Sequence, residues 1–326
     1  MSPVLEGNWL QRASMPVYLG GAELNVATAL AGWELPVCYG TALPDNYLSR
    51  EICAALQRRK IDVSPIRFSG KRIGLYYLPQ GTDLKNAAVI YDREHSSFST
   101  LQRGMIPWEE LLKGVGWFHF SAISPGLNPQ VADVCLEALE IAAAKGISIS
   151  VDLNYRARLW QYGKPAPEVM HPLLKYCDVV MGNIWSANAL LGIPVDEDIH
   201  ARGSRNDYLE HAVRTANAIM ELFPKCSTIA NTFRFDQEGG GILYYASLVR
   251  EKQAYNSVDF VSHNIKDKVG TGDCFMAGLI YGLYQKLPMQ ELVNFAAAAA
   301  FGKFHEEGDA TRQDLQTIQA RMTTHG

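Results

Sequence analysis

A stretch near the C-terminal end, residues 267–278, combines a tight turn with a carboxylate and reads Asp-Lys-Val-Gly-Thr-Gly-Asp-Cys-Phe-Met-Ala-Gly. Its glycines, Gly270 and Gly272, can adopt backbone angles that other residues avoid, and helical spacing of apolar residues begins near Asp273. Free amides at a helix N-terminus, here those of Gly270, Thr271 and Gly272, attract anions. An anion-binding turn beside a base suits phosphoryl transfer to an alcohol. A carboxylate that merely caps a helix is the structural alternative.

A second stretch near the N-terminal end, Gly20-Gly21-Ala22-Glu23-Leu24-Asn25-Val26-Ala27, has the composition of a ligand-binding turn. Paired glycines, Gly20 and Gly21, allow the backbone to lie against a ligand. Asn25 offers both a donor and an acceptor to a hydroxyl group. Taken alone, the stretch is better explained as a turn that starts a helix.

The two stretches together resemble the signatures of the PfkB (ribokinase-like) carbohydrate kinases, written G-G-x-x-x-N-x-A and D-T-x-G-A-G-D. Lys268 replaces the usual threonine and Thr271 the usual alanine. The resemblance implies a sugar kinase that uses ATP and Mg²⁺, with Asp273 as the base. It also implies an anion hole formed by Gly270, Thr271 and Gly272 and a sugar site that includes Gly20, Gly21 and Asn25.

A polar run, residues 152–160, follows an apolar segment that we expect to form a strand, and its pattern D-x-N-x-R-x-x-L-W is similar to that of 2-keto-3-deoxygluconate kinases within the family. The resemblance places Arg156 at the substrate, and Tyr76, Tyr91 and Arg93 in the sugar pocket. Two arginines in one pocket favour an anionic substrate, because guanidinium groups bind carboxylates in paired hydrogen bonds. We therefore expect a sugar acid.

The resemblance places two further residues at the nucleotide. Asn183 matches the family pattern N-x-x-E, in which the glutamate helps to organise Mg²⁺ and phosphate, but Ser186 stands at the glutamate position. Arg234 lies where the family contacts the nucleotide phosphates. We predict no metal ligands among the protein side chains, since the histidines show no metal-binding spacing, and we expect His119 to be packed.

Alternating apolar strands and helices from residue 117 onward predict a parallel sheet covered on both faces, and Val17 to Gly21 could form a short strand. Short β-type runs at 63–93 predict antiparallel strands. With the resemblance, these patterns imply one domain over 1–326 of the α/β class: a ribokinase-like three-layer α/β/α sandwich with a small β-sheet lid, formed by approximately 14–22 and 63–95. The first core strand expected in this family is missing from the N-terminal part of the sequence.

Composition narrows the classes of partner. The chain has 326 residues, a net charge of −4 and no basic run, which argues against nucleic acid as its partner. No apolar run has the length of a membrane span. Six widely spaced cysteines form no disulfide or zinc pattern and indicate a cytoplasmic protein with reduced thiols. Dimerisation through the lid is implied by the resemblance alone.

The sequence thus predicts ATP-dependent phosphorylation of a sugar acid, with 2-keto-3-deoxygluconate as the expected substrate and its 6-phosphate as the product. Two alternatives stay open. A kinase of the same family for a neutral sugar, such as fructose or ribose, would keep the chemistry and change the pocket. A binding protein of kinase ancestry would hold sugar or nucleotide without turnover, and the loss of the glutamate at Ser186 is one reason to consider it. A dinucleotide-binding dehydrogenase is disfavoured because no G-x-G-x-x-G follows an early strand.

Overall fold

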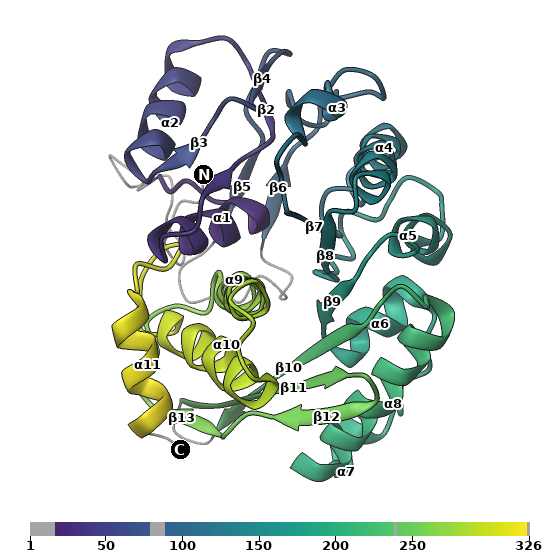
Figure 1. Ribbon diagram of the computed structural model, residues 1–326, viewed down its shortest axis with the longest axis vertical. Helices are drawn as coiled ribbons and strands as arrows, with labels where there is room; N and C mark the ends of the chain where they lie inside the picture. The colour runs from purple at the N-terminus through teal and green to yellow at the C-terminus, as the bar shows by residue number, and fades with distance from the viewer. Residues whose placement is uncertain (1–16, 79–88, 238–239, 325–326) are drawn as a thin grey trace.

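The computed structural model describes residues 17–78, 89–237 and 240–324, and its centre is a seven-stranded mixed sheet (Figure 1). Six strands follow the order β12-β11-β10-β9-β8-β7, and β13 pairs with β11. Strands β7 to β10 are parallel to one another, whereas β11 is antiparallel to β10, β12 and β13. The strands are β7 (Trp117–Ser121), β8 (Ser148–Asp152), β9 (Val179–Gly182), β10 (Thr228–Gln237), β11 (Gly241–Arg250), β12 (Gln253–Asn256) and β13 (Phe260–Ser262).

Helices cover both faces of this sheet, and each layer of helices has its own apolar core. The first layer contains α1 (Ala22–Gly32), α9 (Thr271–Tyr284), α10 (Met289–Lys303) and α11 (Leu315–Thr324). The second contains α4 (Pro129–Ala144), α5 (Ala166–Leu174), α6 (Ile184–Leu191) and α8 (Arg205–Leu222), with the short α7 (Ile199–Arg202) before α8. The predicted three-layer sandwich is confirmed, although the sheet is mixed rather than wholly parallel. No described helix is long and apolar enough to cross a bilayer.

The N-terminal third builds a separate region at the top of Figure 1. It contains α2 (Tyr47–Arg58), α3 (Trp108–Leu111) and three two-stranded sheets: β1 (Val37–Cys38) with β3 (Ile61–Asp62), β2 (Ala42–Leu43) with β4 (Arg67–Phe68), and β5 (Leu75–Tyr77) with β6 (Ile90–Asp92). The runs predicted as antiparallel strands within 63–93 form β5 and β6, which pair antiparallel as expected, whereas β1 with β3 and β2 with β4 are parallel pairs that the sequence analysis did not predict. The strand predicted at 17–21 is absent, and those residues lead as coil into α1.

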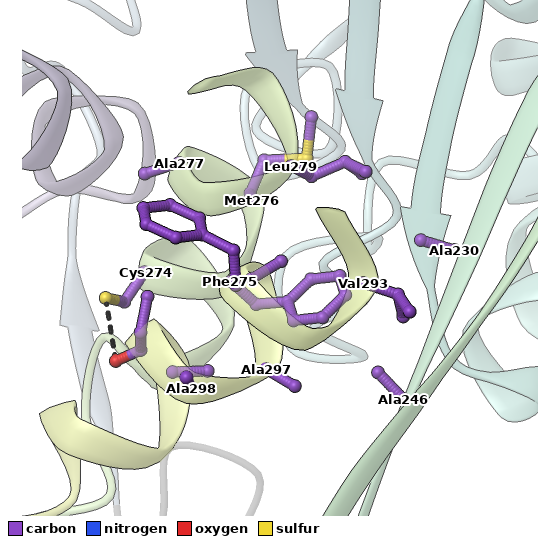
Figure 2. Packing of buried hydrophobic residues seen from close by; sticks show 14 of the residues in the cluster. Ala230, Ala246, Cys274, Phe275, Met276, Ala277, Leu279, Val293, Ala297 and Ala298 are labelled. Carbon is purple, nitrogen blue, oxygen red and sulfur yellow. Dashed lines mark hydrogen bonds between the residues drawn. The ribbon is translucent and has the colours of Figure 1, made fainter. Parts of the chain in front are cut away.

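Helices α9 and α10 pack closely against each other and against the sheet (Figure 2). Gly278 makes this approach possible, because a Cβ there would lie 2.7 Å from the Cα of Ala296. The alanines of α10 are fully buried, and the Cys274 thiol donates to the Ala299 carbonyl at 3.2 Å. Small side chains at this contact favour two rigid neighbouring helices, which fix the turn at the start of α9.

Strand β7 is an edge strand within the described residues, where it pairs with β8. An apolar cavity of about 660 Å³ lies beside it, bounded by α1 residues such as Leu24 and by the Trp117 and Phe120 side chains of β7. At the end of β7 the Glu23 carboxylate accepts the backbone amide of Ser121 at 3.0 Å, so this side chain partly satisfies the edge. The expected first core strand concerns residues that precede 17 and lie outside the described part of the chain.

Candidate active site

The turn at Gly270 has the backbone that the sequence predicts. Gly270 is left-handed, with φ of 72°, and a Cβ there would collide with the carbonyl oxygen of Asp309. The helix begins at Thr271, slightly before the predicted start. Gly272 differs from the prediction, because it lies inside the first helical turn and needs no unusual backbone angle. Apart from its chain neighbours and the backbone of its own helix, no atom of the described residues lies within 4 Å of the position of a Cβ on Gly272.

The segment before the turn is held by its own side chains. The Asp267 carboxylate accepts the amides of Val269 at 3.0 Å and of Gly308 at 3.3 Å. Lys268, which departs from the family signature, donates to Asp236 of β10 at 2.9 Å and so joins the segment to the sheet. The unusual lysine therefore supports the turn rather than disrupting it.

Asp273 is a buried carboxylate in the first turn of α9, with 8% of its surface exposed. Its Oδ2 accepts a hydrogen bond from Asn25 Nδ2 at 2.7 Å, across 248 residues of sequence. Burial raises the pKa of Asp273 to about 7, while the Asn25 hydrogen bond and the charge of Arg156 act in the opposite direction. A carboxylate with a pKa near the working pH suits a general base.

The Asn25 side chain has one atom that is available to a ligand. Its Oδ1 is buried and finds no hydrogen-bond partner among the described residues. Because a buried carbonyl oxygen without a partner is costly, this atom is suited to accept a hydrogen bond from a ligand hydroxyl. Gly20 and Gly21 immediately precede α1, and Gly21 has φ of 147°, a backbone conformation that favours glycine.

Asp309 belongs to the same cluster, although the sequence analysis did not identify it. Tyr76 of β5 donates a hydrogen bond to its carboxylate, and a Cβ on Gly20 would collide with that carboxylate. Burial raises the pKa of Asp309, with the Tyr76 hydrogen bond acting against this shift. The only signal in the sequence is a Gly-Asp pair after an alanine-rich helix, which carries no distinctive spacing.

The predicted arginines do converge. The Arg93 guanidinium lies over the ring of Tyr91 at 4.8 Å and near that of Tyr76 at 5.7 Å. Burial lowers the pKa of Arg93, and the nearby charge of Arg156 lowers it further. Arg156 is near enough to Asp273 to lower the pKa of that carboxyl as well. In the described part of the chain neither arginine forms an ion pair with a carboxylate; Arg156 donates to the carbonyl of Tyr155 at 2.9 Å.

The residues predicted at the nucleotide have structural roles. Asn183 follows β9 and caps α6, since its Oδ1 accepts the amide of Ser186 at 2.8 Å. Arg234 lies on β10 opposite Tyr244 of β11, and burial lowers its pKa. Their contact with a nucleotide stays a prediction. His119 bonds to Ser150 Oγ at 3.0 Å, and burial lowers its pKa to about 4, which agrees with a packed histidine.

The chain matches the family model described as pfkB family carbohydrate kinase over residues 5–313. It is 24% identical over 306 residues to the 2-dehydro-3-deoxygalactonokinase of Haloferax volcanii, an alignment that covers 93% of this chain and 87% of that protein. It is also 24% identical over 319 residues to the 2-dehydro-3-deoxygluconokinase of Bacillus subtilis, which covers 94% of this chain and 88% of that protein.

The fold indicates the same family. The crystal structure of 2-dehydro-3-deoxygluconokinase from Thermotoga maritima superposes with a TM-score of 0.89 at 32% identity, covering 99% of this chain and 96% of that one. Kinases of this family bind a sugar and ATP. The family match over most of the sequence and the shared fold agree with the predicted signatures at both ends of the chain. The chain belongs to the pfkB family of carbohydrate kinases, with the ribokinase-like α/β fold.

Proposed function

We propose that this kinase transfers the γ-phosphoryl group of ATP to a 2-keto-3-deoxy sugar acid, with 2-keto-3-deoxygluconate as the preferred substrate and its terminal hydroxyl as the acceptor. The observation that carries the proposal is the convergence of Arg93 and Arg156 on the pocket that contains Asp273. Relatives named 2-dehydro-3-deoxygalactonokinase and 2-dehydro-3-deoxygluconokinase support the same class of substrate.

The charge of the pocket favours an anion. Arg93 and Arg156 lie near enough to affect each other, and neither is in ion-pair contact with a carboxylate of the described residues, so both guanidinium groups can bind a ligand anion. The Glu23 carboxylate is also near Arg93, where its charge raises the Arg93 pKa, and it accepts the hydroxyls of Ser121 and Ser124 at 2.8 and 2.9 Å. A sugar carboxylate would offset the repulsion between the arginines, whereas a neutral sugar would leave it in place.

Asp273 and Asn25 would contact the hydroxyl end of the substrate. The unpartnered Oδ1 of Asn25 can accept a sugar hydroxyl, and Asn25 Nδ2 holds the Asp273 carboxylate in place. Asp273 then accepts the proton of the attacking hydroxyl as the oxygen–phosphorus bond forms. The amides of Gly270, Thr271 and Gly272 face the charge on the transferred group. Asp309, fixed by Tyr76, is placed to accept a further sugar hydroxyl.

The described residues contain no group of three histidine, cysteine or acidic side chains that could hold a metal by themselves. This arrangement fits Mg²⁺, which usually keeps several waters and binds through substrate phosphates with one or two carboxylates. When bound, Mg²⁺ would neutralise charge on the nucleotide phosphates. The aspartates available near the turn are Asp267 and Asp273, and Asp267 already accepts two backbone amides.

The β5–β6 sheet contributes to the sugar side of the pocket, because Tyr76 and Tyr91 belong to it and Arg93 follows it. We propose that this sheet is a lid which closes over the sugar and excludes water from the transfer. Dimerisation through the same sheet stays a prediction from family resemblance.

Coupled ADP release with ATP and Mg²⁺ tests the proposal on a panel of four substrates: 2-keto-3-deoxygluconate, its galacto epimer, fructose and ribose. We expect turnover with the keto-deoxy acids, and kcat/KM for fructose and ribose at least about 100-fold lower, as loss of an ionic hydrogen-bond pair implies. Preferential turnover of a neutral sugar would reject the substrate and keep the kinase. Absence of turnover with all four would favour the alternative of a sugar- or nucleotide-binding protein.

A further inference from the structure

Lys303, the last residue of α10, is a fully buried lysine that the proposed mechanism does not use. Its Nζ donates a hydrogen bond to the Glu306 carbonyl at 3.1 Å, and no ion pair joins it to a carboxylate of the described residues. The Glu306 carboxylate is bound instead by the Thr311 hydroxyl at 2.6 Å and the Arg312 amide at 2.9 Å. Burying an ammonium with so few partners costs several kcal/mol, so its charge needs an explanation.

Lys303 lies directly behind the anion-binding turn. Its Cε is 3.6 Å from the position of a Cβ on Gly270, on the glycine that gives the turn its left-handed backbone. The next residue, Phe304, accepts the backbone amides of Lys266 and Asp267 through its carbonyl, at 2.9 and 3.2 Å. The end of α10 is therefore bonded to the segment that leads into the turn.

The arrangement of α9 and α10 explains why a positive charge at Lys303 would favour anion binding at the turn. A short connection, 285–288, joins α9 to α10, and the two helices pack side by side (Figure 1). The C-terminal end of α10, which carries a partial negative charge, thus lies beside the partially positive start of α9. Without a cation there, α10 would weaken the attraction of the turn for phosphate.

Lys303 lies near two buried acidic groups on which a positive charge would act. Lys303 acts to lower the pKa of Asp309 and of the Cys274 thiol, although burial raises both. Asp309 touches the turn through its carbonyl and the sugar side through its carboxylate. The Lys303 side chain is therefore near both the Gly270 turn and Asp309, whose carboxylate faces the proposed sugar pocket.

We propose, on the basis of the proposed function, that Lys303 is a positioning residue for phosphoryl transfer, whose buried ammonium keeps the Gly270–Gly272 turn electropositive and Gly270 in its left-handed conformation. Lys303 acts through the turn and does not touch the sugar. Its removal should therefore lower kcat and leave the KM for the sugar nearly unchanged. If Lys303 only bonded the free carbonyl groups at the end of α10, its removal would lower the stability of the protein and leave both kcat and KM unchanged.

Lys303→Met keeps the length of the side chain and removes its charge. We expect kcat to fall by about 10- to 100-fold, less than the roughly 10²- to 10³-fold loss caused by removing a donor that contacts transition-state charge directly, while KM for the sugar changes less than about twofold. The matched control is Lys145→Met, which removes another cation at a helix end, the C-cap of α4, where Lys145 pairs with Glu109 at 2.7 Å. This control should retain the wild-type kcat.

Chemical rescue separates charge from packing. Lys303→Ala leaves space for a small amine, so ethylammonium or propylammonium should restore part of its kcat in a saturable manner, and sodium chloride at equal ionic strength should not. The same amines should leave the inactive Asp273→Asn variant unchanged. The melting temperature of every variant is measured with and without amine, alongside its kcat.

Three results would overturn the role of Lys303: a wild-type kcat in Lys303→Met, a loss of kcat that no amine restores and that follows the fall in melting temperature, or a Lys303→Met chain that does not fold. Each of these leaves the proposed function intact as long as the wild type phosphorylates a sugar acid and Asp273→Asn does not. Failure of the wild type on every sugar would instead reject the proposed function itself.

Discussion

The sugar side and the nucleotide side of this kinase differ in how their polar atoms are used. On the sugar side, Asn25 Oδ1 has no partner, and Arg93 and Arg156 form no ion pair with a carboxylate of the described residues. Among the residues predicted to contact the nucleotide, Asn183 caps α6, since its Oδ1 accepts the amide of Ser186. Unused polar atoms in a buried position call for a ligand, whereas the partnered ones are already explained by the fold.

This difference explains why the structure supports the proposed sugar site more strongly than the predicted nucleotide contacts. The sugar pocket is built from segments far apart in the sequence, which meet only because α1, α9 and the β5–β6 sheet are brought together. Its geometry thus supports a ligand of stated charge. The nucleotide residues could be kept for stability alone, so their binding role depends on measurement.

The largest expected effect is at the base. Asp273→Asn should lower kcat by about 10²- to 10⁴-fold, the usual contribution of a general base, with little change in fold because the amide is isosteric. The measurement is coupled ADP release at saturating ATP and sugar acid. Asp207→Asn is the control, since Asp207 also lies in the first turn of a helix, in the capping box of α8. Near-normal turnover in Asp273→Asn would remove Asp273 from the base role.

The next effect concerns substrate charge. Arg93→Ala and Arg156→Ala should each lower kcat/KM for 2-keto-3-deoxygluconate by roughly 10- to 150-fold, the worth of a hydrogen bond to a charged group, and should affect fructose much less. The assay belongs at pH 8.5, because loss of Arg156 also raises the pKa of Asp273. Arg50→Ala, on an exposed ion pair with Asp45, is the surface control. Equal losses for the acid and the neutral sugar would contradict an anionic substrate.

The smallest expected effect concerns Asn183, which is predicted to contact the nucleotide. Asn183→Ala should lower the free energy of unfolding by about 1 kcal/mol, the usual cost of an N-cap, as measured by urea denaturation. Asn46→Ala removes the same kind of cap, from α2, and should cost a similar amount. If KM for ATP rises more than about threefold in Asn183→Ala alone, Asn183 contacts the nucleotide in addition to capping α6.

The sequence predicted the parts of the site that lie in short signatures. The left-handed Gly270 and the helix that follows it come from residues with local backbone preferences, whereas the hydrogen bond between Asn25 and Asp273 joins two signatures whose contact the sequence analysis did not predict. The alternation of strands and helices after residue 117 gave the three layers, because their apolar periods are clear.

The remaining features depend on tertiary contacts that no local pattern encodes. Asp309 enters the sugar pocket through a loop after α10, and Lys303 looks in sequence like an ordinary cation at a helix end. The parallel pairing of β1 with β3 and of β2 with β4 joins very short strands, whose direction local propensity does not determine. Gly272 was assigned a backbone role, whereas the structure gives it open space beside a helix.

The central claim, that Asp273 is a base whose pKa is set by burial and by Asn25, is tested most directly by the pH dependence of kcat/KM for the sugar acid between about pH 5.5 and 9. Because a base must be deprotonated, the rate should rise with pH and level off above an inflection near the Asp273 pKa of about 7. Asn25→Ala removes a hydrogen bond that lowers this pKa, so its inflection should move to higher pH. A profile that is flat over this range, or one that Asn25→Ala does not shift, would contradict the account.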